Sequence, residues 1–182
     1  MITVAGMNIS AEARIPFPRE AVFALFRDRL ADVVERASNA RIASVQDRTA
    51  SGAFLLVKTK WHGGGGLPAA VRGIVTEAML AWTTESIWSG DAFFCDWRIA
   101  ADALLPDAVQ CSGRTAFLVG EGGETSVRIK GEVRTDAKKL PGVPSFLATK
   151  VGRAVEEFLV AKIQSNLLEA ASRAEEQLKP VG

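Results

Sequence analysis

The chain holds few side chains that can take part directly in acid–base or nucleophilic chemistry. It contains one histidine, His62, and two cysteines, Cys95 and Cys111. A general base that works near neutral pH is most often a histidine, so a histidine-dependent mechanism would have to use His62. That residue ends a strand-like segment and precedes four glycines. We expect it to be exposed there, and we predict no catalytic residue.

The spacing of the other candidate groups matches no reaction motif. No cluster of histidine, cysteine and carboxylate has the spacing of metal ligands, and the sequence contains no Gly-x-Ser-x-Gly nucleophile elbow. Gly63–Gly66 lacks the Gly-Lys-Ser/Thr ending of a phosphate-binding loop. We interpret this glycine run as a flexible flap or an inert turn, and we expect neither a metal nor a cofactor.

Composition narrows the function further. The 182 residues suit one domain, which we take to span residues 1–182, and 48% of them are hydrophobic, enough for a sizeable core. The net charge is +1 and no basic face is visible, so we expect no nucleic-acid partner. The first residues do not resemble a secretory signal, and no apolar run reaches the roughly 18 residues of a membrane span. We expect a cytoplasmic protein without stable membrane insertion, whose two thiols stay reduced.

Alternation of apolar and polar residues predicts seven strands. It is clearest in Thr125–Thr135, where Val127, Ile129, Gly131 and Val133 alternate with charged residues. The other predicted strands are Asn8–Ile15, Ala40–Arg48, Gly52–Trp61, Met79–Trp88, Ala92–Ala100 and Val109–Val119. Such alternation is typical of a sheet with one face on a core and the other in water.

Helical spacing predicts three helices. One begins near Pro18, and a short second one covers about Ala31–Ala37. The third runs from Ser145 to Lys179, about 35 residues and roughly 50 Å of helix. Its apolar stripe comprises Phe146, Val151, Val155, Phe158, Leu159, Ile163, Leu167, Ala170, Ala171 and Ala174, with charged residues including Glu156 opposite. So long a stripe needs a long apolar surface, and the sheet is the only candidate.

The order of these elements resembles the helix-grip fold of the START and polyketide-cyclase superfamily, also called SRPBCC. The resemblance is carried by Ala11–Phe23, where an apolar strand, a proline and a Val-Phe helix follow one another, and by the final helix. Trp82–Ile99 and Leu140–Pro144, with Lys162–Leu167, resemble an uncharacterised bacterial branch of the superfamily. The resemblance implies an α+β fold: a curved seven-stranded antiparallel sheet around a long C-terminal helix, with two short helices after the first strand.

The same resemblance implies an apolar cavity between the sheet and the helix. We predict that its lining comprises Leu55, Val57, Thr59, Trp61, Phe93, Cys95, Trp97, Ile99, Cys111, Thr115, Phe117, Val127, Ile129, Phe158, Ile163 and Asn166. The alternative is that these residues fill a solid core. Asn166 interrupts the apolar stripe, and its amide needs partners that a ligand, a sheet carbonyl or a buried water could supply.

Three functions fit this sequence. Superfamily members bind lipids, sterols and polyketides, so we predict a protein that binds a hydrophobic small molecule or lipid, and we favour binding over catalysis. A cyclase or dehydratase acting on a polyketide-like substrate would need an inward acid or base, whereas Asp96 and Arg98 are expected to point outward. A protein-interaction scaffold or a homodimer would be indicated by joint exposure of the aromatic residues Phe54, Trp82, Trp88 and Phe94.

Overall fold

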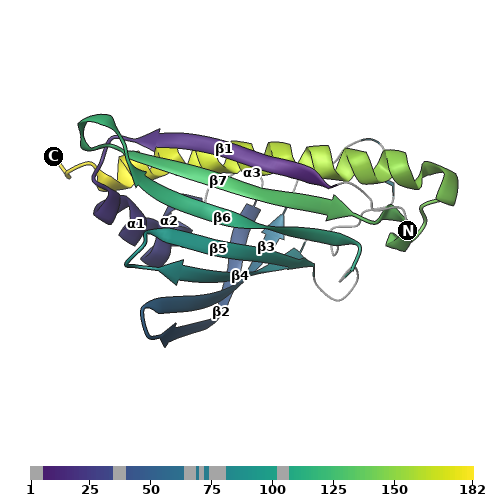
Figure 1. The fold of residues 1–182 in the computed structure, drawn as a ribbon, viewed down its shortest axis with the longest axis horizontal. Coiled ribbons are helices and arrows are strands. Elements are labelled where there is room, and N and C mark those ends of the chain that lie inside the picture. The colour runs from purple at the N-terminus through teal and green to yellow at the C-terminus, as the bar shows by residue number, and fades with distance from the viewer. Residues whose placement is uncertain (1–5, 35–39, 64–68, 70–71, 74–80, 102–106) are drawn as a thin grey trace.

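The chain forms one seven-stranded antiparallel sheet in the order β1-β7-β6-β5-β4-β3-β2 (Figure 1). The computed structural model describes residues 6–34, 40–63, 69, 72–73, 81–101 and 107–182. The strands are β1 (Met7–Ile15), β2 (Ala40–Ser51), β3 (Phe54–Gly63), β4 (Ala81–Ser89), β5 (Phe94–Ala101), β6 (Val109–Val119) and β7 (Thr125–Thr135). The chain therefore starts at one edge, crosses to the opposite edge, and returns strand by strand until β7 lies beside β1.

Among the described residues, three α-helices accompany the sheet. These are α1 (Arg19–Asp28), α2 (Leu30–Val34) and the long α3 (Ala148–Leu178). In Figure 1, α3 runs along the β1–β7 side of the sheet, and α1 and α2 lie near its C-terminal end. Together with the antiparallel sheet, these helices confirm the predicted helix-grip architecture and its α+β class. No helix among the described residues is both long and apolar enough to cross a membrane.

Some element boundaries differ from the prediction. Ser145–Leu147 forms a separate 3-10 turn, so α3 begins at Ala148 and Phe146 is left 83% exposed. The first two residues of the predicted fourth strand, 79 and 80, lie outside the described residues, as do residues 35–37 of the second helix and Gly64–Gly66. The long helix is otherwise continuous, as its period indicated.

Small side chains allow α3 to pack closely against the sheet. The main packing contacts of α3 with the sheet are with β1 and β7. One core cluster contains Ala13 of β1 together with Ala170, Ala171 and Ala174 of α3. Alanine allows a helix to approach a strand closely because it fills little of the space between the two backbones. Because α3 rests on this edge, the concave face of the remaining strands stays open to other residues.

Glu156 is an exception to the charged outer face predicted for α3. Its side chain is 5% exposed, and Oε1 accepts a hydrogen bond of 2.8 Å from the backbone N–H of Thr135, the last residue of β7. Gly152, one turn earlier, brings the helix close to this strand end, since a Cβ there would lie 3.3 Å from the Thr135 carbonyl oxygen. The prediction for Glu156 was wrong because the helix turns this face toward β7.

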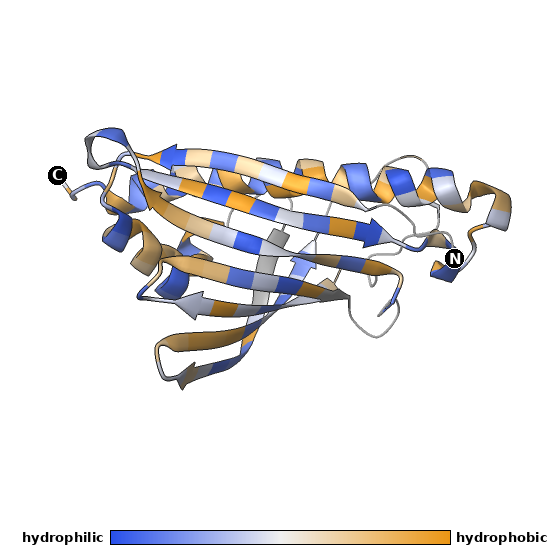
Figure 2. Ribbon diagram, viewed as in Figure 1, coloured by the Kyte–Doolittle hydropathy of each residue, from blue (hydrophilic) through white to orange (hydrophobic). Residues whose placement is uncertain are grey.

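The hydropathy pattern of the strands follows the expected alternation. Figure 2 shows orange and blue residues alternating along β1 and β7. In β7, Val127 and Val133 are fully buried, whereas Arg128 and Lys130 between them are exposed. One face of this sheet thus meets the helices and the other meets water, as the period of two requires.

We predict that Ala174→Leu destabilises the protein by about 1–3 kcal/mol, because the added atoms must push α3 away from its seat. Ala174 is 0% exposed. Urea unfolding followed by circular dichroism measures the change. Ala161→Leu, the same substitution at an exposed position of α3, is the control and should change stability by no more than about 0.5 kcal/mol. Equal effects of the two substitutions would contradict this packing of α3.

Candidate functional site

An apolar cavity of about 260 Å³ lies between the concave face of the sheet and the three helices. Its described lining carries no charged side chain. The lining residues are Phe26, Leu30 and Val34 from α1 and α2, Thr59 and Trp61 from β3, Trp82, Thr84, Ser86 and Trp88 from β4, Cys95, Trp97 and Ile99 from β5, Thr115 and Phe117 from β6, Ile129 from β7, and Ile163, Asn166, Leu167 and Ala170 from α3. Most of the exposed surface inside this space is therefore hydrocarbon.

All four tryptophans of the chain line this cavity: Trp61, Trp82, Trp88 and Trp97. Trp61 and Trp82 are directly paired across β3 and β4, and their rings stack with centroids 6.3 Å apart and planes inclined by 5°. Indole rings give large, flat walls that favour aromatic partners. The sheet thus supplies a broad aromatic surface, and α3 supplies the opposite wall.

Several polar groups in and beside the lining already have partners. The Trp97 Nε1–H donates to Thr115 Oγ1 over 3.1 Å. The Trp88 Nε1–H donates to Ser86 Oγ over 3.1 Å, and the Ser86 hydroxyl donates to the Val57 carbonyl over 3.2 Å. These bonds fix the orientation of two indole rings and leave their N–H groups satisfied.

Two other polar atoms of the lining have no partner among the described residues. These are Trp61 Nε1, a donor, and Asn166 Oδ1, an acceptor, and both atoms are buried. Leaving a buried polar group unpaired costs about 1–3 kcal/mol. Trp61 from the sheet and Asn166 from the helix both line the cavity, while these two atoms themselves are buried within the protein.

The cavity brings together most of the residues predicted to line it. Those found in the lining are Thr59, Trp61, Cys95, Trp97, Ile99, Thr115, Phe117, Ile129, Ile163 and Asn166. Period-two alternation on β3, β5 and β6 was sufficient to choose their common face. Contact with a ligand remains a prediction for each of them.

Six predicted residues do not line this cavity. Leu55, Val57, Phe93 and Val127 pack in the main core cluster beside α1, and Cys111 packs with Ile9 and Val133 in another cluster. Phe158 is half-buried on α3, with the Lys162 ammonium 5.5 Å from its ring centroid. Leu55 and Val57 instead line two other, separate pockets.

Sequence reasoning missed the contribution of β4 to the cavity. In the register, Trp82 lies opposite Trp61 and Thr84 lies opposite Thr59, so the inward face of β3 determines that of β4. The pattern was obscured in the sequence because inward Thr84 is polar, while outward Ile87 is apolar and 44% exposed. The lining residues Phe26, Leu30, Val34, Ser86, Trp88, Leu167 and Ala170 were also not predicted.

The aromatic surface patch considered for a scaffold function does not form. Trp82 and Trp88 face the cavity, and Phe94 is half-buried beneath the Arg114 guanidinium, 3.9 Å from its ring centroid. Phe54 is 45% exposed. Asp96 lies on the outer side of the sheet, where it accepts hydrogen bonds of 2.5 and 2.7 Å from Arg114. Strand register turns Trp82 and Trp88 inward, so the joint exposure that would indicate a scaffold or a homodimer is not found for these four residues.

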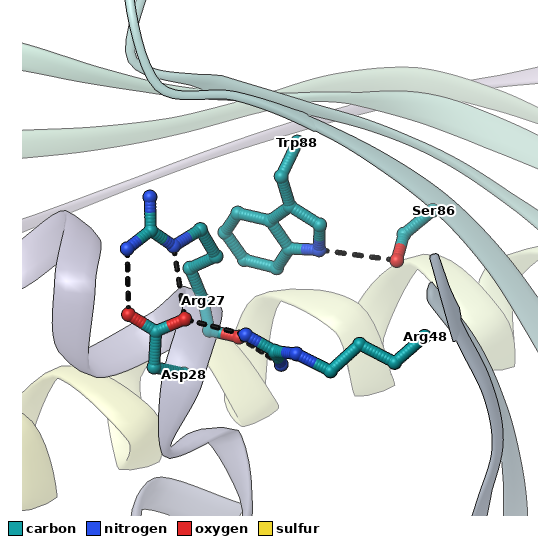
Figure 3. A network of polar contacts seen from close by, with 5 residues as sticks. All are labelled: Arg27, Asp28, Arg48, Ser86 and Trp88. Atoms are coloured by element: carbon teal, nitrogen blue, oxygen red, sulfur yellow. Dashed lines mark hydrogen bonds and ion pairs between the residues drawn. The ribbon is translucent and has the colours of Figure 1, made fainter. Parts of the chain in front are cut away.

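A polar network lies beside Trp88 (Figure 3). Asp28 of α1 accepts hydrogen bonds from Arg27 Nε and Nη2, at 2.9 and 2.7 Å, and from Arg48 Nη2 of β2, at 2.6 Å. Hydrogen bonding to Arg27, followed by that to Arg48, holds the pKa of Asp28 below its usual range despite partial burial. The network ties edge strand β2 to α1, and Trp88 separates it from the cavity.

The potentially reactive side chains are poorly placed for chemistry. Burial raises the pKa of the Cys95 thiol well above its usual range and that of Cys111 to about 12, so both thiols stay protonated at neutral pH. Both cysteines are free. His62 is exposed near the end of β3 and does not line the cavity. No group of three potential metal ligands occurs among the described residues.

Comparison with known proteins places this geometry in a recognised fold. No family model matches the sequence, and no curated protein is similar to it. A protein from Thermus thermophilus has a TM-score of 0.65 and 17% identity, with the match covering 95% of this chain and 100% of that one. The Zhui aromatase/cyclase from a Streptomyces species has a TM-score of 0.67 and 12% identity, covering 98% and 99%.

A third structure is norcoclaurine synthase from Thalictrum flavum, solved in complex with dopamine and hydroxybenzaldehyde. Its TM-score is 0.59 at 9% identity, and the match covers 97% of this chain and 90% of that one. Identities this low show a common fold and leave the chemistry to be argued from the site. The chain has the helix-grip fold that these proteins share.

We predict that neither thiol of the native protein reacts with Ellman's reagent at pH 8, since the thiolate is the reactive form. Both should react once the protein is unfolded. Because burial raises the native pKa of Cys111 to about 12 from 9.0, its contribution to stability is complete below about pH 9 and declines at higher pH.

Urea unfolding between pH 8 and pH 10.5 tests this sign. The wild-type midpoint should fall over this range, and the Cys111→Ala variant should lose less of its own midpoint. A native thiol that reacts as fast as the unfolded one would contradict the burial described here.

Proposed function

We propose that this helix-grip chain binds a neutral hydrophobic small molecule in the cavity between its sheet and α3. The observation that carries the proposal is the lining itself, which combines four indole rings with aliphatic side chains and has no charged group among its described residues. Cavities of this composition, with a few placed polar groups, are typical of small-molecule sites. The aromatase/cyclase and synthase among the structural neighbours are compatible with a fold that surrounds small organic molecules.

The size of the cavity restricts the ligand. An apolar cavity of about 150 Å³ accommodates benzene. A volume of about 260 Å³ therefore suits a molecule of roughly two fused rings. Burying its apolar surface would contribute about 25 cal/mol per Å², before the cost of association is subtracted.

The absence of charge in the described lining also restricts the ligand. Moving an ionised carboxylate or ammonium into a low-dielectric space is strongly unfavourable unless an opposite charge pairs with it. The described lining provides hydroxyl, indole, thiol and amide groups but no such partner. Neutral ligands are therefore favoured over fatty acids and other ions.

Catalysis is less well supported than binding. A cyclase or dehydratase would move protons through an acid or base beside the substrate. Of the described lining residues, Cys95 alone carries a titratable group, and burial raises its pKa well above its usual range.

The two free, buried thiols are compatible with the reducing cytoplasm, where we expect this protein to work. A homodimer remains a prediction.

Intrinsic tryptophan fluorescence can test the proposed site, because every indole of the chain lines it. Titration with 2-methylnaphthalene should change the emission and saturate at one molecule per chain. The anion 2-naphthoate, similar in size, should bind at least about tenfold more weakly because its charge has no partner. Native mass spectrometry of the freshly purified protein should also detect any neutral ligand that co-purifies.

We predict that Thr84→Phe, which fills the cavity from β4, weakens 2-methylnaphthalene binding at least about tenfold, equivalent to about 1.4 kcal/mol. Ile87→Phe adds a ring on the same strand but on the outer face, where Ile87 is 44% exposed, and should leave binding unchanged. Saturable binding that survives Thr84→Phe would place the ligand elsewhere. No binding of any neutral aromatic would remove the proposal.

A further inference from the structure

We propose that the segment connecting β7 to α3 docks reversibly on an anionic lipid surface, with the exposed ring of Phe146 as its apolar anchor. The docking segment comprises residues 137–153, which include the first turns of α3. None of these residues belongs to the described lining of the cavity. The proposal therefore concerns a separate surface and does not depend on the proposed function.

The apolar part of the docking segment is a turn that holds a phenyl ring in solvent. Phe146 is 83% exposed, and its neighbour Leu147 is 38% exposed. Leu140 before the turn and Ala148 after it are buried in one core cluster. Within the turn, the Leu147 N–H donates to the Pro144 carbonyl over 2.9 Å. A packed backbone thus holds Phe146 outward and leaves its ring facing water.

The charged part of the docking segment is entirely basic. It contains Lys138, Lys139, Lys150 and Arg153, all exposed, and no acidic residue. The chain has 22 basic and 21 acidic residues, so 18 basic residues stand against 21 acidic ones outside the segment. The three lysines form no ion pair with the described residues, whereas Arg153 pairs with Glu157 over 3.0 Å. Positive charge is therefore concentrated in this part of an otherwise slightly acidic chain.

The basic and apolar side chains lie at the same end of the molecule. Phe146, Lys150 and Arg153 are four and three positions apart, a spacing that places side chains on one side of a helix. The 3-10 turn Ala137–Lys139, which carries the other two lysines, contacts α3. In Figure 1 the start of α3 forms the end of the long axis opposite the C-terminus. A flat surface can meet such a tip.

This combination favours an anionic bilayer over other partners. Each lysine or arginine near such a surface strengthens binding about fivefold, and an apolar side chain adds affinity by entering the boundary between headgroups and acyl chains. A second copy of this chain would present the same positive charge and be repelled. A nucleic-acid duplex would pair with the lysines but offers the ring of Phe146 no hydrocarbon.

Cosedimentation with lipid vesicles measures the proposed docking. We expect wild-type protein to bind vesicles of equal parts phosphatidylcholine and phosphatidylglycerol at least about tenfold more tightly than vesicles of phosphatidylcholine alone. Raising the salt concentration from about 0.1 M to about 1 M should remove most of this preference, because the Debye length falls from about 10 Å to about 3 Å.

Matched substitutions of phenylalanine assign the apolar contact. Phe146→Ser should weaken binding to the anionic vesicles at least about fivefold. Phe54→Ser, at a phenylalanine of β3 that is 45% exposed, should leave it unchanged. Phe146→Trp should bind at least as tightly as wild type, because tryptophan favours the membrane interface. Since the ring of Phe146 is exposed, both of its variants should keep the wild-type melting temperature.

Matched substitutions of lysine distinguish local charge from net charge. The double variant Lys138→Gln with Lys139→Gln should weaken binding to the anionic vesicles at least about tenfold. Lys58→Gln with Lys130→Gln removes the same charge from exposed positions of β3 and β7, and should weaken binding by about twofold or less.

Four results would overturn the proposal. They are no binding of wild-type protein to the anionic vesicles, equal binding to the neutral ones, unchanged binding of both Phe146→Ser and the Lys138 and Lys139 double variant, and tighter binding to RNA than to the vesicles. A wild-type dimer that Phe146→Ser dissociates in analytical ultracentrifugation would assign the surface to a second copy and also overturn it. Binding in the cavity is measured separately, by tryptophan fluorescence.

Discussion

The contact of α3 with one edge of the sheet is the constraint on which the rest of this structure depends. Alanines on both elements let the helix lie close to β1 and β7. A straight helix seated on one edge of a curved sheet cannot also cover the remaining strands. Indole rings and residues of α1 and α2 therefore cover the inner face of β3 to β6. The cavity is the space that these side chains leave empty.

The chemistry of this cavity is determined by which polar groups are already satisfied. Hydrogen bonds within the lining pair the N–H groups of Trp88 and Trp97, whereas Trp61 and Asn166 keep unmet capacity. Of the described lining residues, Cys95 alone carries a titratable group, and burial raises its pKa well above its usual range. The fold by itself does not tell binding from catalysis. The Zhui aromatase/cyclase and norcoclaurine synthase have the same fold at only 12% and 9% identity.

Much of the fold was readable from periodicity. The period of two in Val127, Ile129 and Val133 and the helical period after Pro144 reflect burial on one side of an element, which each segment encodes locally. Seven strands and the long helix were therefore predictable, and the resemblance to the helix-grip fold implied that the strands are antiparallel. The inward residues of β3, β5 and β6, including Thr59, were predictable for the same reason.

Other features were decided only when the elements met in space. The sequence of β4 mixes inward Thr84 with outward Ile87, so its face is determined by pairing with β3 and not by its own pattern. The helical pattern predicted Glu156 to be a surface charge, but the side chain is buried against the end of β7. The alternation within a strand predicts which of its residues lie on the same face of the sheet. It cannot state which buried donors and acceptors find partners, because Trp61 and Asn166 are over a hundred positions apart and only packing brings them to one cavity.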